Sequence, residues 1–487
     1  MKKLLIIAAL FLFGTLKSNA QDSCKCLLNF THYVDKVSNN YAGFKDKVNP
    51  RTEKTYNLMV DSLRKVSENT KLLRGCYDVL EAYRVFFYDK HLQLNANLPP
   101  EPTTPNAPVS NNAPTQTMWT KALIMNDLEK RKNALNPMEG VWNTEGYQVG
   151  VVFNEKEKRY DGVILEAGNA KWKVGMVKFS SKMMGPTVYD MVYVRGDFAL
   201  DTMSSKVLKN YLVVPKYGTW KKSFPMSRDT LTDFEAAAEL SDVRFNFLND
   251  TTLYIALKSC DMSNKPILDT LMVRNAERLK KTPYWIVDFR NNSGGSTDVY
   301  TSLLPYLYTK TLISKGNKRW MSPENTQKLK AYMVENQKVM DAETYRYIKN
   351  MVEFGEKNPS GWFNDNGDTT KFDKVLPFPR KVDVLTNKNN GSSGETFLIV
   401  ARGLSDKVTI FGENSAGYLD YGDIMPYTMP CDNFQINIPA RRANYLDYGI
   451  SYDKTGYPPD VYIPKMTKDW LKFVNDYWAK NPLKWRP

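Results

Sequence analysis

Residues 381–404 read KVDVLTNKNNGSSGETFLIVARGL, and the pattern changes abruptly in the middle of this stretch. The first six residues form a short apolar run typical of a buried strand, and apolar residues follow at helical spacing from Ser393 onward. Asn389, Asn390 and Gly391 lie between the two patterns and are turn formers, and glycine tolerates a positive φ. The stretch therefore predicts a strand that turns sharply into a helix, with Ser392 at the helix N-terminus.

Strand and helix patterns alternate on both sides of this turn. The strand candidates are TTLYIALKS (251–259), YWIVDF (284–289) and KVTIFG (407–412), and the helix candidates between them are ILDTLMVRNAERLKK (267–281) and VYTSLLPYLYTK (299–310). Such alternation implies an α/β layer with mostly parallel strand pairing. We predict this core over residues 229–487, interrupted by a charged and largely helical insertion at residues 316–373.

Residues 117–228 have a different period. They contain short β-branched and aromatic runs separated by turn residues: YQVGVVFN, YDGVILEA, WKVGMVKFS, YDMVYVRG and KNYLVVPKYG. This pattern predicts a small antiparallel barrel or sandwich. We find no catalytic pattern in it, so its expected role is that of a scaffold or a module that presents substrate.

The N-terminal part divides into three segments. Residues 1–20 have a basic start, an apolar run over 4–13 and a small-residue cleavage site at Ser18-Asn19-Ala20, the pattern of a secretory signal peptide. A membrane anchor is the weaker alternative because the apolar run is shorter than the ~20 residues that span a bilayer. Residues 21–95 carry helical patterns, and the Pro-, Asn- and Thr-rich residues 96–116 indicate a linker. We expect a periplasmic or secreted protein without a membrane span once the signal is removed.

Composition narrows the range of partners. The 487 residues have a formal net charge of +14, but the basic residues are spread along the chain and accompany no nucleic-acid motif, so we expect no nucleic-acid partner. Five cysteines are an odd number for an oxidising compartment, and either Cys24 or Cys26 could pair with Cys76. No CxxC pair has zinc spacing, and we predict neither a metal nor another cofactor. The oligomeric state is open.

Ser392 is a candidate nucleophile or a helix cap. Backbone N–H groups converge at a helix N-terminus and stabilise an oxyanion there. However, Ser-x-x-Glu at 392–395 also fits a capping box, and taken alone this motif favours the cap. The turn after the strand 284–289 contains Gly294-Gly295, which lets backbone N–H groups approach a ligand. In a parallel sheet both turns lie at the carboxyl ends of strands, where ligands bind.

A serine nucleophile needs a proton acceptor, and the chain has two histidines. His32 lies in a helical pattern and is interpreted as a surface or packing residue. His91 lies where an apolar run ends at a polar step. A carboxylate is also wanted to orient the imidazole, and Asp453 in the late loop YGISYDKTGYPPDVYIP is the candidate.

Several motifs, in the same order along the chain, resemble the C-terminal-processing (tail-specific) serine peptidase family, particularly its tricorn-core-like branch. WIVDFRNNSGGS resembles the family's strand and glycine turn, SSGETF its nucleophile box, and KVTIFGENSAG the strand and turn that follow. YDKTGYPPDVYIP is similar to its closing segment, and YDKHLQL to its Asp-Gly-His-Thr step. The likeness covers residues 25–95 loosely and 230–465 well.

The resemblance implies a crotonase/ClpP-like ββα core and endopeptidase activity without a metal. Carried over by position, Ser392 is the nucleophile, and the N–H groups of Ser393 and of Gly294 or Gly295 form the oxyanion hole. Tyr418 stands where many relatives have a dyad lysine, whereas His91 fits the branch that uses histidine, with Asp453 at the place of its orienting glutamate. Residues 117–228 look unlike the PDZ domain of many relatives.

Sequence patterns thus favour an exported serine endopeptidase that hydrolyses peptide bonds through an acyl-enzyme on Ser392 with His91 as general base. The alternative is a non-catalytic peptide- or lipid-binding protein on the same fold, because the family resembled here also includes binding repeats without protease activity. A degrader of cell-wall or surface polymer is the third hypothesis, and no carboxylate pair at glycosidase spacing supports it.

Overall fold

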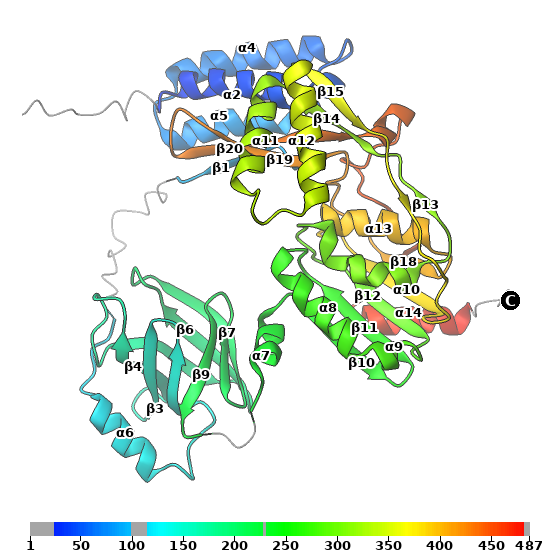
Figure 1. Cartoon of the computed structure of the whole chain (residues 1–487). Helices are drawn as coiled ribbons and strands as arrows, with labels where there is room; N and C mark the ends of the chain where they lie inside the picture. The colour runs from blue at the N-terminus through cyan, green and yellow to red at the C-terminus, as the bar shows by residue number, and fades with distance from the viewer. Residues whose placement is uncertain (1–23, 99–113, 227–229, 482–487) are drawn as a thin grey trace, which may run out of the picture.

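The computed structural model describes residues 24–98, 114–226 and 230–481. Figure 1 shows N-terminal helices at the top, an α/β core below them and a separate barrel at the lower left. The predicted signal peptide 1–20 and most of the predicted linker 96–116 lie outside the described residues. No helix in the described ranges is long and apolar enough to cross a membrane.

A six-stranded sheet forms the centre of the core. Its order is β10-β11-β12-β17-β18-β21, and every neighbouring pair is parallel except β10 with β11. The strands are β10 (Val243–Asn249), β11 (Thr252–Leu257), β12 (Tyr284–Asp288), β17 (Lys381–Thr386), β18 (Val408–Gly412) and β21 (Val461–Tyr462). The predicted α/β fold class is confirmed, and β17, the strand that leads to Ser392, lies inside the sheet with all six residues buried.

Helices cover both faces of this sheet. On one face lie α8 (Lys265–Arg274), α9 (Ala276–Leu279), η2 (Thr297–Leu303), α10 (Leu304–Leu307) and α13 (Ser393–Leu404), which share one apolar core with alternate residues of β11, β12 and β17. On the other face α14 (Trp470–Lys480) packs against Ile286, Leu385 and Phe411. Both faces of the parallel strands are therefore buried, as their nearly continuous apolar runs require.

A second sheet joins the N-terminal helices to the core. Helices α2 (Cys26–Asn40), α4 (Glu53–Asn69) and α5 (Leu73–Val85) pack on it and share its apolar core. Its strands are β1 (Gln93–Ala96), β14 (Asn317–Met321), β15 (Gly361–Asp365), β19 (Tyr421–Thr428) and β20 (Phe434–Ala443). Because β1 pairs antiparallel with β20, the helical region is not an independent unit.

Two disulfides reinforce this junction. Cys26 pairs with Cys76, which is one of the two alternatives left open by the sequence, and Cys24 pairs with Cys431 between β19 and β20. The second bond joins residues 407 positions apart. It attaches the first described helix to the hairpin on which that helix packs.

The insertion at 316–373, predicted to be largely helical, also contains strands. It contains two helices, α11 (Pro323–Glu335) and α12 (Ala342–Lys357), which pack together through Leu329, Met351 and their neighbours. However, β14 and β15 flank these helices, and β14 also pairs with β20. Only the middle of the segment is helical, because its two ends extend the second sheet.

The middle of the chain forms a closed antiparallel barrel of eight strands in chain order. The strands are β2 (Gly140–Thr144), β3 (Tyr147–Asn154), β4 (Arg159–Ala167), β5 (Val177–Met183), β6 (Val188–Val194), β7 (Leu200–Leu208), β8 (Tyr211–Val214) and β9 (Gly218–Phe224). Pairing of β2 with β9 closes the barrel, and helix α6 (Lys121–Lys130) covers its outside. The five runs seen in the sequence match β3, β4, β5, β6 and β8.

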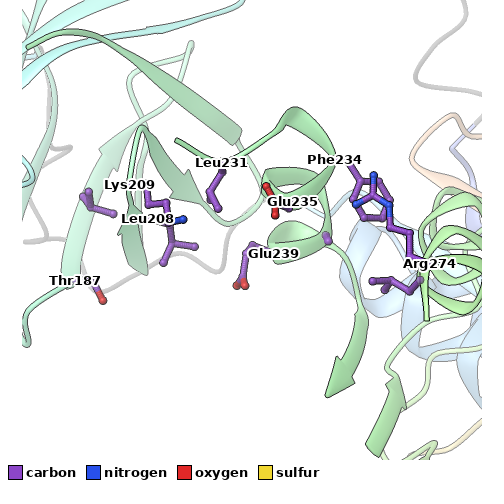
Figure 2. Close-up of a pocket in the computed structure, with 11 residues that line it drawn as sticks. Thr187, Leu208, Lys209, Leu231, Phe234, Glu235, Glu239 and Arg274 are labelled. Carbon is purple, nitrogen blue, oxygen red and sulfur yellow. The ribbon is translucent and has the colours of Figure 1, made fainter. Parts of the chain in front are cut away.

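Helix α7 (Asp233–Leu240) connects the barrel to the core. It contacts β8 and β9 on one side and α8 on the other. Beside α7 lies a groove of about 550 Å³, whose lining residues include Leu208, Leu231 and Phe234 (Figure 2). Arg274 of α8 also lines it and lies over the Phe234 ring. The barrel end formed by the β5–β6 and β7–β8 turns therefore faces the core.

The disulfide between Cys24 and Cys431 makes a testable contribution to stability. Replacing both residues by Ser should lower the free energy of unfolding by about 2–5 kcal/mol, since the bond restricts the unfolded chain. Urea denaturation with and without a reducing agent measures this loss. An unchanged midpoint in the double variant would contradict it.

Candidate active site

Ser392 lies in a strained turn at the carboxyl end of β17. Its backbone has φ +55° and ψ −118°, values that non-glycine residues rarely adopt. A strained turn from strand to helix is the geometry of the nucleophile elbow of hydrolases. Close packing enforces the turn, because a Cβ on Gly394 would come within 2.1 Å of the Asn390 side chain. Strain of this kind collects at functional sites.

His91 reaches Ser392 from 301 residues upstream. Its Nε2 lies 3.2 Å from Ser392 Oγ, and its Nδ1 lies 2.7 Å from the backbone carbonyl of Tyr421. A carbonyl only accepts hydrogen bonds, so Nδ1 carries the proton and Nε2 offers its lone pair to the serine hydroxyl. His32, the other histidine, lies on α2, where its ring nitrogen is 3.1 Å from the Thr428 carbonyl in an exposed contact.

Burial sets the protonation of His91. The ring is 5% exposed, and this desolvation lowers its pKa below the ordinary 6.5, although the charge of Asp89 acts in the opposite direction. Asp89 also accepts hydrogen bonds from the His91 backbone N–H at 2.8 Å and from the Tyr41 hydroxyl at 2.7 Å. The imidazole is thus held neutral at neutral pH, in the form that accepts a proton.

Asp453 lies near this histidine but does not contact its ring. Its carboxylate accepts from Lys47 Nζ at 3.0 Å, and burial together with the charge of Asp89 raises its pKa. The orienting acceptor on Nδ1 is the Tyr421 carbonyl instead. The structure therefore differs from the predicted role of Asp453, because the β19 backbone occupies the position that a carboxylate would need.

Two backbone N–H groups are available beside Ser392. Within the described residues, those of Gly295 and Ser393 have no acceptor, while that of Gly294 donates to the Asn292 side chain at 2.8 Å. Of the three predicted oxyanion-hole donors, the geometry thus leaves Gly295 and Ser393. Gly294 has a different function: a Cβ there would lie 2.8 Å from the Ser392 Cβ, so only glycine allows the two turns to meet.

Two buried side chains fasten these turns, and the sequence indicates only the capping role of one of them, Glu395. The Asn292 side-chain amide donates to the Leu257 carbonyl at 2.8 Å, and the Asn292 backbone carbonyl accepts from the Gly391 N–H at 2.9 Å. Glu395 accepts from the backbone N–H groups of Ser392, Gly417 and Tyr418 at 2.7–2.8 Å. Glu395 was assigned as half of a capping box, and this half is present. Its bonds to the distant turn at 415–418 left no local signal in the sequence.

The fifth cysteine lies behind this arrangement. Cys260 is buried and free, and it contacts the amide of Asn292. Burial raises the pKa of its thiol, so it stays protonated and inert. In the part of the chain that the structure describes, no three His, Cys, Asp or Glu side chains converge as metal ligands.

A serine on a strained turn, a neutral histidine in hydrogen-bond reach and two free N–H groups define a serine hydrolase site. The sequence profile described as peptidase family S41 matches residues 251–463, which include Ser392 and both turns. Residues 251–463 therefore carry the peptidase family S41 match, and the protein is a serine-type peptidase. The family resemblance predicted from the ordered motifs is thus confirmed.

Solved structures show only a distant likeness. A putative peptidase from Parabacteroides merdae is 17% identical, with a TM-score of 0.33 over 50% of this chain and 66% of that one. Mature CPAF is 10% identical, with a TM-score of 0.48 over 94% of this chain and 96% of that one. The photosystem II D1 C-terminal processing protease is 12% identical, with a TM-score of 0.35 over 93% of this chain and 95% of that one. The chain spans about two thirds of the first structure. No curated protein matches the chain.

The close approach of Gly294 to Ser392 is open to a direct test. Gly294→Ala adds a Cβ in contact with the nucleophile and should lower kcat about ten- to a hundredfold, because small displacements of the reacting group cost that much. Gly218→Ala is the matched control: its φ of +86° resembles the +84° of Gly294, but the added Cβ meets open space. Equal activity of the two variants would show that the contact is unimportant.

Proposed function

We propose that this protein is an exported serine endopeptidase that forms an acyl-enzyme on Ser392 with His91 as general base. The observation that carries the proposal is the 3.2 Å separation of His91 Nε2 and Ser392 Oγ, joined across 301 residues. This is hydrogen-bond reach for a base and its nucleophile without any domain movement. A protein that only binds peptide or lipid needs no such pair.

The reaction follows from the geometry. His91 Nε2 accepts the Ser392 proton as Oγ bonds to the carbonyl carbon of the peptide, and the negative charge on the carbonyl oxygen faces the N–H groups of Gly295 and Ser393. The protonated imidazole then gives this proton to the leaving amine as the C–N bond breaks. Water, deprotonated by His91, attacks the ester, and Ser392 recovers its proton as the acid leaves.

The positive charge on His91 during the reaction is stabilised by groups other than Asp453. The Tyr421 carbonyl accepts the Nδ1 proton, and the negative charge of Asp89 favours the imidazolium. Asp453 acts only indirectly: its carboxyl group pairs with Lys47 and interacts electrostatically with Asp89. We propose this arrangement in place of a histidine–carboxylate pair.

Export to a periplasmic or extracellular location is part of the proposal. It is supported by the signal-peptide pattern of residues 1–20, which lie outside the described structure. Two disulfides between described cysteines also suit an oxidising compartment. Peptides or proteins are the substrates that the family implies. Selectivity for a substrate's C-terminus is not part of the proposal, because residues 117–228 look unlike the PDZ domain of many relatives.

Removing the nucleophile tests the mechanism. Ser392→Ala should lower peptide hydrolysis by at least about a thousandfold and abolish covalent labelling by a serine-directed phosphonate, since no other group attacks the substrate. Ser293→Ala, which removes an exposed hydroxyl of the glycine turn, is the control and should keep both. Wild-type protein that binds peptides but neither cleaves them nor labels would favour the non-catalytic alternative.

The pKa of His91 predicts the pH dependence. Activity requires neutral His91, so kcat/KM should fall as the pH drops through a pKa below 6.5, because burial lowers the His91 pKa. Asp89→Asn keeps an acceptor for the His91 N–H but removes a charge that raises this pKa. It should therefore move the acidic limb to still lower pH. A limb above 6.5, or one that Asp89→Asn leaves in place, contradicts the assignment.

A further inference from the structure

The barrel contains a buried ammonium group without a counter-charge. Lys178 is 1% exposed, and its Nζ donates to one acceptor among the described residues, the Val194 carbonyl at 2.7 Å. No described carboxylate forms an ion pair with it. Burying an unpaired charge is costly, so such groups normally have a partner of opposite sign.

Aromatic faces surround this ammonium on three sides. The ring centroids of Trp172, Tyr147 and Tyr193 lie 4.2, 4.6 and 4.6 Å from Nζ. Cation–π contacts offset part of the desolvation but leave the charge uncompensated. Desolvation consequently lowers the pKa of Lys178 to about 8.

The other unsatisfied polar atoms nearby are mostly donors. The indole N–H groups of Trp172 and Trp220 are buried and have no acceptor among the described residues, and both rings lie against Tyr147. Buried indole N–H groups usually find an acceptor. The unpaired buried acceptor beside them is the Gln148 side-chain oxygen. One ammonium and two indole N–H groups thus outnumber the acceptors, which is the pattern of an anion site.

Strand topology places this cluster at the free end of the barrel. Tyr147 begins β3, Lys178 and Trp172 lie at and before the start of β5, Tyr193 is near the end of β6, and Trp220 is near the start of β9. In an up-and-down barrel these positions share one end. The opposite end carries the β5–β6 and β7–β8 turns that line the groove facing the core.

A pocket opens at the free end, directly outside the cluster. It has a volume of about 420 Å³ and is lined by the β2–β3 hairpin and the end of β4, including Asn143, Tyr147, Gln148 and Glu166. Tyr147 lines this pocket and also lies against the Lys178 ammonium. The one carboxylate on its wall, that of Glu166, is paired with Lys121. Because Lys178 is 1% exposed, a ligand in this pocket reaches Nζ only if the Tyr147 ring moves aside.

We propose that this end of the barrel binds a small carboxylate carried on an apolar, flat body, with Lys178 as its counter-charge. A monoanion matches the single ammonium, whereas a phosphate dianion would leave one charge unpaired in an apolar site. The carboxylate oxygens would accept from Nζ and from the indole N–H of Trp172, and the body would lie on the aromatic rings. The site is separate from Ser392 and does not depend on the proposed peptidase mechanism.

Calorimetric titration of the full chain with 1-naphthoate tests this site, with neutral 1-naphthamide as the matched ligand. The naphthoate should bind at least about tenfold more tightly, because the amide lacks the charge that pairs with Lys178. At about pH 9, above the Lys178 pKa of about 8, binding should take up close to one proton as the ammonium re-forms. Titrations in buffers of different ionisation enthalpy measure that uptake, and decanoate tests whether an aliphatic body is also accepted.

Lys178→Met should abolish the proton uptake and weaken naphthoate binding by the same factor. Lys222→Met is the matched control: burial lowers its pKa to about 8 as well, and it lies over Trp142, but it bonds to the carbonyls of Pro137 and Glu139 at the core-facing end. This control should bind naphthoate normally.

Three results would overturn the site. They are no binding of naphthoate or decanoate at millimolar concentration, equal binding of the naphthamide, and binding by wild type without proton uptake at about pH 9. The last measurement needs no variant, so it decides the matter even if Lys178→Met fails to fold.

Discussion

The hydrogen bond from His91 Nδ1 to the Tyr421 carbonyl is the contact on which the site depends. It completes a hydrogen-bond network around the site. His91 contacts Ser392, and the Ser392 N–H donates to Glu395. Glu395 also accepts from the N–H groups of Gly417 and Tyr418, just before Tyr421 in the chain. Every bond in this network either joins segments that are distant in sequence or holds a turn in place. The nucleophile, the base and the strand that orients the base are thus positioned together.

This network exists only because the N-terminal region and the core are one structural unit. The pairing of β1 with β20 follows His91 directly in the chain, and the Cys24–Cys431 bond fastens the same hairpin from the other side. Lys47, from the N-terminal helices, completes the charge balance of Asp453, a core residue. Loss of this interface would separate the base from the nucleophile without disturbing either turn.

Local patterns predicted the core better than its surroundings. Helix 393–404 and strands β12, β17 and β18 are apolar and bounded by turn residues, so their pattern alone predicts them. Strand β7, with the sequence LDTMSSKVL, buries few residues and gave no apolar run, so the barrel's closure was not visible. Strand β20 begins with FQINI, which alternates apolar and polar residues, but it was not among the predicted strands; near its end Arg442 is buried against Asp46.

The sequence by itself determined the strand–turn–helix at Ser392, the glycine turn beside it and the family, because these depend on residues adjacent in the chain and on the order of their motifs. It also made His91 the candidate base, but only through resemblance. Only the tertiary structure decided that a backbone carbonyl orients this histidine, that Asp453 pairs with Lys47, and that Gly294 serves packing while Gly295 keeps its N–H free. Those roles depend on distances between segments hundreds of residues apart, which no local pattern encodes.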